Sequence, residues 1–217
     1  MGEIGFHDVL EEVNGEGYQR IMVALVRLLT TYSVKVLLGI AHLRQVPVLL
    51  FKDVGLLKRI GFTATQIREG VCNRGRGKSR PIPRKILGEL LCRLTEGEVF
   101  GIFDGAIRNL SKKKYIRDDT FILDTSPLKT TKLYENCGMK KVVERKWDRA
   151  KKKVVEIVDY IYGFKIGMIQ GAESRIPVSC GFSQIQVHDN NFTEVLVKQA
   201  ESNIGRKIKL LLIDCGF

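Results

Sequence analysis

Apolar residues at helical spacing dominate the first half of the chain. They recur every three or four positions from residue 18 to residue 29, which predicts one buried face of a helix. The residues are Tyr18, Ile21, Met22, Leu25, Leu28 and Leu29. A second apolar pattern runs from Val34 to Leu43, and we expect Pro47 to interrupt it. Gly61 in "LLKRIGF" stands where a helix would end.

Two further helices are predicted between Pro83 and Leu110. Thr95 is followed three residues later by Glu98, which is the spacing of a capping box. The second of these helices is therefore expected to begin just after Thr95. Residues 18 to 110 as a whole have the pattern of a helical region.

The pattern changes near residue 118, where strand-like segments begin. The stretch "TFILDTSP" (120–127) is a short apolar run between polar residues, which is typical of a buried strand. Residues 154–171 are rich in β-branched and aromatic residues and alternate around Phe164 and Ile166. Residues 175–189 alternate through Ile185 and Val187, and "ESR" (173–175) is expected to form a hairpin turn between the two strands.

A helix and one last strand complete this half. Asn191 is expected to cap the helix and Gly205 to end it. One face of the helix carries Phe192, Val195, Leu196 and Ala200. The strand "KIKLLLID" (207–214) is apolar on both faces, so we expect it to be central in a sheet. A crossover through a helix implies that this strand runs parallel to an earlier one. The fold class is therefore α/β (α+β), a helical region followed by a mixed sheet with flanking helices.

Composition and charge narrow the class of protein. The 217 residues are 44% hydrophobic and 28% charged, which is typical of a globular chain. Arg27, Lys35 and Arg44 divide the apolar stretch 21–51 into runs too short to cross a bilayer, and no signal peptide is expected. The five cysteines are widely spaced, with no CxxC pair. We therefore expect reduced thiols in a cytoplasmic protein without a membrane association.

A net charge of +12 favours a polyanionic partner, most simply nucleic acid, although a basic protein without such a partner is the alternative. One basic segment, 72–85, has six basic and no acidic residues. It resembles a phosphate loop in "GRGKS", but Cys72 stands where that motif needs glycine, and no buried strand precedes it. We expect either DNA-phosphate contact or a solvated loop. The candidate DNA-binding residues are Arg74, Arg76, Lys78 and Arg80.

The second basic segment, 139–153, carries eight basic residues against two acidic ones. It also contains Trp147, the only tryptophan of the chain, and an aromatic among cations is compatible with nucleic-acid contact. The alternative is a solvated charged face with Trp147 partly buried. The candidate DNA-binding residues here are Lys146, Arg149, Lys151 and Lys152.

Two aspartates end apolar runs, Asp124 in "FILD" and Asp214 in "LLLID". If the two strands are parallel neighbours, their carboxylates lie roughly 4.8 Å apart and repel each other unless a cation lies between them. Two divalent ions about 3.5–4 Å apart, bridged by such carboxylates, catalyse phosphoryl transfer. The alternative is that each aspartate is a turn residue. His188 and Asp189 form another candidate ligand pair, with Asp189 more simply a helix cap.

Several segments together resemble the DDE transposases of bacterial and archaeal insertion sequences. They are "LDTSPLKTTKLYENCG", "YGFKIGMIQGAESRIPVSCGFSQIQVHDNNF" and "LLLIDCGF", with "LLGIAHLRQVPVLL" and "FTATQIREGVCNRGRGKSRPIPRKILGELLCRL" before them. The resemblance implies a helical DNA-binding or accessory region over residues 1–117 and a partial RNase H-like catalytic domain over 118–217. It also implies Mg²⁺ or Mn²⁺ bound by Asp124 and Asp214, the first and second acidic residues of that family.

The family's third acidic residue, a glutamate on a later helix, lies well downstream of the second aspartate, whereas this sequence ends three residues after Asp214. We therefore expect an incomplete, inactive copy of an enzyme that cuts and joins DNA at insertion-sequence ends. With two of the three carboxylates it should bind Mg²⁺ or Mn²⁺ weakly if at all. DNA is the expected partner and a homo-oligomer a possible assembly. One alternative is a non-catalytic DNA-binding fragment that competes with full-length transposase. Another is a nuclease of the same fold that acts on RNA or hybrids.

Overall fold

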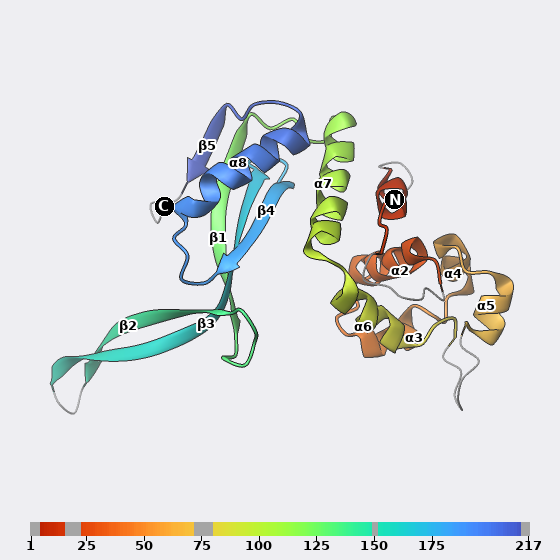
Figure 1. The fold of residues 1–217 in the computed structure, drawn as a ribbon, viewed down its shortest axis with the longest axis horizontal. Coiled ribbons are helices and arrows are strands. Elements are labelled where there is room, and N and C mark those ends of the chain that lie inside the picture. Colours follow the sequence, from red (N-terminus) through yellow and green to blue (C-terminus); the bar gives the residue numbers. More distant parts are fainter. Residues whose placement is uncertain (1–4, 16–22, 72–79, 149–151, 214–217) are drawn as a thin grey trace. The chain divides into compact units, whose positions relative to one another are not determined.

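The computed structural model describes residues 5–15, 23–71, 80–148 and 152–213 (Figure 1). The chain forms a mixed α/β structure divided into two compact units, Met1–Ala106 and Ile107–Phe217. We call them unit 1 and unit 2 and describe each by itself. None of the described helices is both long and apolar enough to cross a bilayer.

Unit 1 is helical, as predicted. Its elements are α1 (Phe6–Glu11), α2 (Leu25–Leu37), the 3₁₀ turn η2 (Leu43–Gln45), α3 (Val46–Leu49), α4 (Val54–Ile60), α5 (Ala64–Glu69), α6 (Arg84–Arg93) and α7 (Glu96–Lys112), the last of which continues into unit 2. Two predicted helix boundaries are confirmed. Gly61 ends α4 at φ 101°, a left-handed conformation that suits glycine. Thr95 Oγ1 accepts from the Glu98 amide at 3.2 Å, and Glu98 Oε2 accepts from the Thr95 amide at 2.9 Å, which is the predicted capping box.

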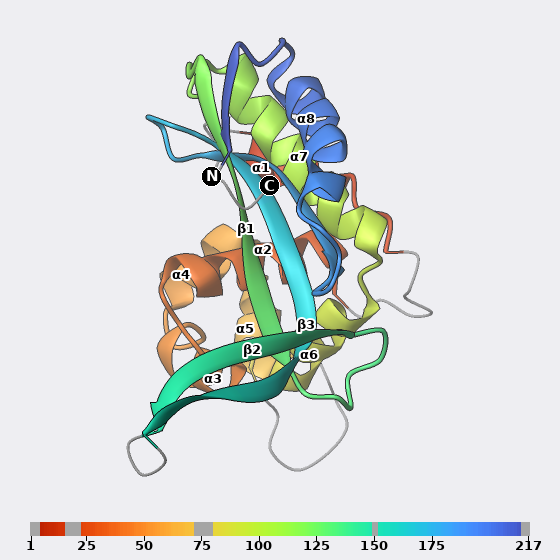
Figure 2. The same cartoon turned by 90° about the vertical axis from the view of Figure 1, so that its left-hand side faces the viewer.

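Unit 2 contains a sheet with mixed strand directions. Its strands are β1 (Thr120–Thr130), β2 (Gly138–Asp148), β3 (Lys153–Gly171), β4 (Pro177–Gln184) and β5 (Leu210–Ile213), and α8 (Asn190–Ile204) connects β4 to β5. The order is β2-β3-β1-β5, with β4 also paired to β3. Figure 2 shows β5 beside β1, and the two strands are parallel, which confirms the predicted crossover. Among the described strands β5 lies at an edge, so the expected central position is not observed.

A row of small residues lets α8 pack closely on one face of the sheet. Thr125, Gly167 and Gly181 are cross-strand neighbours on β1, β3 and β4. A Cβ atom on Gly167 would lie 2.7 Å from Phe192 Cδ1, which is too close for any real side chain. Phe192 and Leu196 are buried at this contact. The prediction for α8 holds at Gly205, whereas the helix begins at Asn190 and leaves Val195 exposed.

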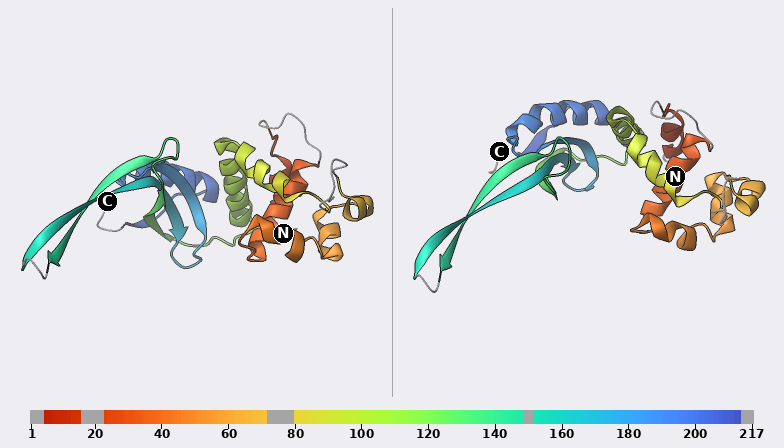
Figure 3. Two further views of the ribbon diagram at one scale, coloured as in Figure 1. Left: turned by 90° about the horizontal axis from the view of Figure 1, so that it is seen from below. Right: turned by 60° about the horizontal axis from the view of Figure 1, so that its bottom comes forward.

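Strand β2 was not predicted. Its eleven residues pair with the first half of β3, from Gly138↔Gly163 to Asp148↔Lys153. The two strands extend beyond the rest of the sheet as a two-stranded ribbon (Figure 3). We call β2 together with residues 153–163 of β3 the arm. Residues 139–148 and 153 of the predicted basic segment therefore lie on the arm, and Trp147 is 61% exposed.

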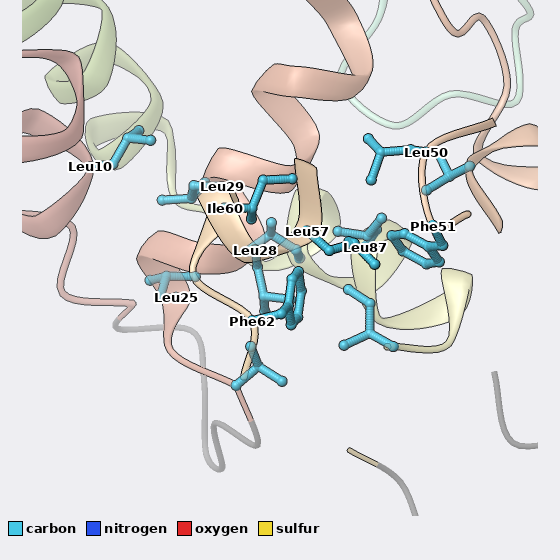
Figure 4. Close-up of a cluster of buried hydrophobic side chains, with 14 of the residues drawn as sticks. Leu10, Leu25, Leu28, Leu29, Leu50, Phe51, Leu57, Ile60, Phe62 and Leu87 are labelled. Atoms are coloured by element: carbon cyan, nitrogen blue, oxygen red, sulfur yellow. The ribbon is translucent and has the colours of Figure 1, made fainter. Parts of the chain in front are cut away.

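The core of unit 1 is one cluster of buried apolar side chains from α1, α2, α4, α6 and their connections (Figure 4). Leu25, Leu28 and Leu29 are buried, as the spacing predicts, but α2 begins only at Leu25. The other predicted members of this face, Tyr18, Ile21 and Met22, lie outside the described residues. The second apolar pattern is not a separate helix, because Val34 and Leu37 belong to α2 and Leu37 is exposed. Pro47 does not interrupt a helix but lies in the first turn of α3. Backbone amides in a first turn have no acceptor within the helix, so the missing amide hydrogen of proline removes no helical hydrogen bond there.

Candidate functional site

The structure brings the strand that carries Asp124 beside the strand that leads to Asp214. Parallel pairing between β1 and β5 runs from Thr120↔Leu210 to Leu123↔Ile213. Leu123 immediately precedes Asp124, and Ile213 immediately precedes Asp214 in the sequence. The predicted arrangement of the two strands is therefore confirmed, while Asp214 itself lies outside the described residues.

Asp124 lies on the open face of the sheet. Its cross-strand neighbour on β3 is Met168, whose neighbour on β4 is Cys180, and cross-strand neighbours share a face. α8 packs against the opposite face of the sheet, and Asp124 is exposed. Its Oδ1 accepts a hydrogen bond from the Thr125 amide at 2.7 Å. This is an accessible oxygen donor of the kind that Mg²⁺ and Mn²⁺ prefer.

Asp189 is not the side-chain cap that the sequence favours. It occupies the N-cap position of α8, but its carboxylate makes no capping hydrogen bond. Instead, Oδ1 accepts from Lys165 Nζ at 2.6 Å and from Thr125 Oγ1 at 3.0 Å. Lys165 Nζ also donates to the Val187 carbonyl at 2.8 Å. These contacts join β3, β1 and the start of α8 on the covered face, directly behind the backbone that carries Asp124.

The hydrogen bonds of this cluster determine the pKa of Asp189. Burial raises the pKa of Asp189, but the hydrogen bonds from Lys165 and Thr125 outweigh burial and hold the pKa below its ordinary value. His188, its predicted ligand partner, accepts from the Asn190 amide at Nδ1 over 3.3 Å. Across the described ranges no group of three or more His, Cys, Asp and Glu side chains is arranged to hold a metal ion.

Lys165 is a site residue that the sequence reasoning missed. It is buried, with a side-chain exposure of 9%, on the strand face that also carries Gly163 and Gly167. The alternation in "YGFKIGMIQG" places a lysine among positions that face the core, and that was the available signal. A buried ammonium group needs a carboxylate partner, which here is Asp189.

The candidate DNA-binding residues are only partly described. Arg80 and Lys152 are exposed, and Lys146 on the arm pairs with Glu144 at 2.7 Å. That hydrogen bond raises the pKa of Lys146 above its ordinary value. Other predicted residues lie outside the described part of the chain, namely Arg74, Arg76, Lys78, Arg149 and Lys151.

Unit 1 adds a basic cavity that the sequence did not reveal. Its volume is about 550 Å³, and η2 and α6 form its walls. Four cationic side chains line it, from Arg44, Arg84, Lys85 and Arg93, together with Glu89 and the exposed thiol of Cys92. Lys85 and Glu89 form an ion pair at 3.6 Å, so the net charge of the lining is positive.

In unit 2, therefore, the exposed Asp124 follows the β1 residues that pair in parallel with the end of β5. Searches of protein-family models, curated proteins and solved structures each found no match to this chain.

Proposed function

We propose that unit 2 carries the two-aspartate part of an RNase H-like, DDE-transposase-type site, the class of site that cuts and joins DNA by metal-dependent phosphoryl transfer. The observation that carries the proposal is the parallel pairing of β1 and β5 up to Leu123↔Ile213. The residues that follow this pair in the sequence are the two aspartates. Adjacent parallel strand ends bring such residues close together, as a shared metal site requires.

The described chemistry is compatible with Mg²⁺ or Mn²⁺. Asp124 offers an exposed carboxylate on the open face, where no described helix covers it. Asp124 and Asp214 would hold the metal, and a bound divalent ion would activate the attacking oxygen and stabilise the leaving one. Within the chain itself, the Thr125 amide orients Asp124 Oδ1, and the Asp189–Lys165 pair holds Thr125 from behind.

DNA is the substrate that the charge distribution favours. The net charge is +12. Lys140, Lys141, Lys146 and Lys153 lie along the arm, and four cationic side chains line the cavity between η2 and α6. Cations at the surface contribute to DNA affinity through contacts with phosphates. The segments that resemble insertion-sequence transposases extend over both units, which favours DNA over RNA as the substrate.

The proposal is tested with the full chain, Mn²⁺ and plasmid DNA. We expect Mn²⁺ binding, followed by electron paramagnetic resonance, to weaken at least tenfold in Asp124→Asn. Any Mn²⁺-dependent nicking or strand transfer should disappear in the same variant. Ser126→Ala, which alters an exposed residue on the same face two positions away, serves as the control. Mn²⁺ binding that is equal in the wild type and Asp124→Asn would refute the metal site.

A second candidate, DNA binding without catalysis, rests on the basic cavity and the arm rather than on the aspartates. It predicts DNA affinity that falls steeply with salt and survives Asp124→Ala and Asp214→Ala. DNA binding without Mn²⁺-dependent chemistry would favour this candidate over the first. Affinity that is absent or insensitive to salt would remove both.

A further inference from the structure

The arm has one face of apolar side chains that nothing in the described structure covers. Cross-strand pairs in register alternate between the two faces of the ribbon, so Val143↔Val158 and Trp147↔Val154 lie on the same face. We call it the apolar arm face. Its members, all 46% to 61% exposed, are Met139, Val143, Trp147, Val154, Val158 and Tyr160.

The exposed area is large for so small an element. Six half-exposed side chains of this size present roughly 600 Å² of surface. The largest apolar patch on a typical monomer is about 300–600 Å². A two-stranded ribbon on its own is also only marginally stable in water. β2 pairs with β3 and with no other described strand, so this ribbon gains stability if its apolar face is covered.

The chemistry of the face favours protein over nucleic acid. Valines occupy its centre, and its one arginine, Arg145, is already paired with Glu156 at 3.0 Å. Lys141 is the only other cation in register on this side, whereas Lys140, Lys146 and Lys153 belong to the opposite face. A phosphate backbone requires cations, and valines offer none. DNA contact therefore suits the opposite face of the arm.

We propose that the apolar arm face docks against the same face of a second copy of this chain. A two-fold axis through the centre of the face would set valines against valines and place Trp147 of each copy toward the Tyr160 end of the other. With the stems of Lys141 and Arg145 added, the buried area approaches the roughly 800 Å² per partner of a standard interface. The inference does not depend on the proposed DNA chemistry.

The test is the oligomeric state of the full chain without DNA, measured by sedimentation equilibrium in 0.5 M NaCl. We expect a dimer at micromolar concentration, with Val143→Glu and Val158→Glu each raising the dissociation constant at least tenfold. Ile157→Glu is the matched control, because Ile157 is 45% exposed on the same strand but faces the opposite side. Circular dichroism of each variant shows whether it is folded. Equal dissociation in Ile157→Glu and Val158→Glu would overturn the proposal.

Trp147 provides a second readout because it is the only tryptophan and lies on the proposed interface. Its emission should shift to the red when the wild type is diluted, and should not change on dilution of Val143→Glu. A chain that stays monomeric, with emission that responds only to added duplex DNA, would show that the face binds nucleic acid and would overturn the proposal. A dimer that binds no DNA would refute the proposed function and leave this inference intact.

Discussion

Lys165 and Asp189 form the most strongly constrained pair of residues in unit 2. The ammonium group is buried, and its partners are the Asp189 carboxylate at 2.6 Å and the Val187 carbonyl. Removing one partner of a buried ion pair leaves an uncompensated charge, so we expect Asp189→Asn to lower the free energy of unfolding by about 2–4 kcal/mol. Urea denaturation followed by circular dichroism measures this change.

A double variant tests whether the cost comes from the unpaired charge. Lys165→Met combined with Asp189→Asn removes both charges, and we expect it to be more stable than Asp189→Asn alone. Lys198→Met, which removes one partner of an exposed pair with Glu194, should leave the urea midpoint unchanged. A double variant that is no more stable than Asp189→Asn would show that packing, not charge, makes the site sensitive.

Asp118 makes the stability of unit 2 depend on pH. Burial raises the pKa of Asp118, but hydrogen bonds from Ser174 and from the Glu173 amide outweigh burial and hold the pKa below its ordinary value of about 3.9. A carboxyl with a lowered folded pKa stabilises the fold above its ordinary pKa, and the contribution is lost as pH falls through the folded pKa. We therefore expect the urea midpoint to fall below about pH 4.

Asp118→Asn isolates this contribution, because asparagine keeps an oxygen acceptor but does not titrate. The variant should lose roughly 1–2 kcal/mol at pH 7, and its urea midpoint should change less than that of the wild type between pH 5 and pH 3. If the urea midpoint changes equally with pH in the two proteins, other carboxylates, such as Asp189, cause the acid sensitivity.

At the scale of elements, the packing of α8 on the sheet depends on Gly167. A Cβ atom there would lie 2.7 Å from Phe192 Cδ1 and 3.0 Å from Leu196 Cδ1, so a larger side chain must displace the helix. We expect Gly167→Val to reduce the free energy of unfolding by about 1–3 kcal/mol. Ser126→Val, exposed on the opposite face of the sheet, adds a similar side chain without meeting α8 and should be nearly neutral. Similar losses in both variants would contradict the close packing of α8.

The elements that the sequence predicted are those with a buried face. β1 and α8 place Phe121, Leu123, Phe192 and Leu196 in the core, and burial is what creates a readable apolar period. β2 gave no such signal, because both of its faces are largely exposed and its valines are interspersed with charged residues. The parallel arrangement of β1 and β5 could be predicted because a helix connects the strands, and such crossovers join parallel strands. The role of Asp189 did not, because its contact with Thr125 joins positions 64 residues apart.

At the scale of the whole molecule, the two units divide the proposed work between them. Unit 2 supplies the acidic strand end and the arm, and unit 1 supplies a cavity lined by four cationic side chains. An acidic metal site repels DNA phosphates unless cations elsewhere hold the duplex. The basic surfaces are therefore a physical requirement of the proposed chemistry, and they should account for most of the affinity of the chain for DNA.

The salt dependence of DNA binding measures how many cations take part. Each phosphate contact contributes about 0.9 to the slope of log K against log salt concentration for duplex DNA. We expect Lys146→Ala combined with Lys152→Ala, and separately Arg44→Ala combined with Arg84→Ala, each to reduce the slope by about 1–2. Fluorescence anisotropy with a labelled duplex between 50 and 200 mM NaCl provides the measurement.

The control is Lys198→Ala, which removes an exposed cation of α8 and should leave the slope unchanged. A uniform decrease in all three variants would mean that net charge alone attracts DNA, whereas a decrease confined to one pair would place the duplex on the arm or in the cavity of unit 1.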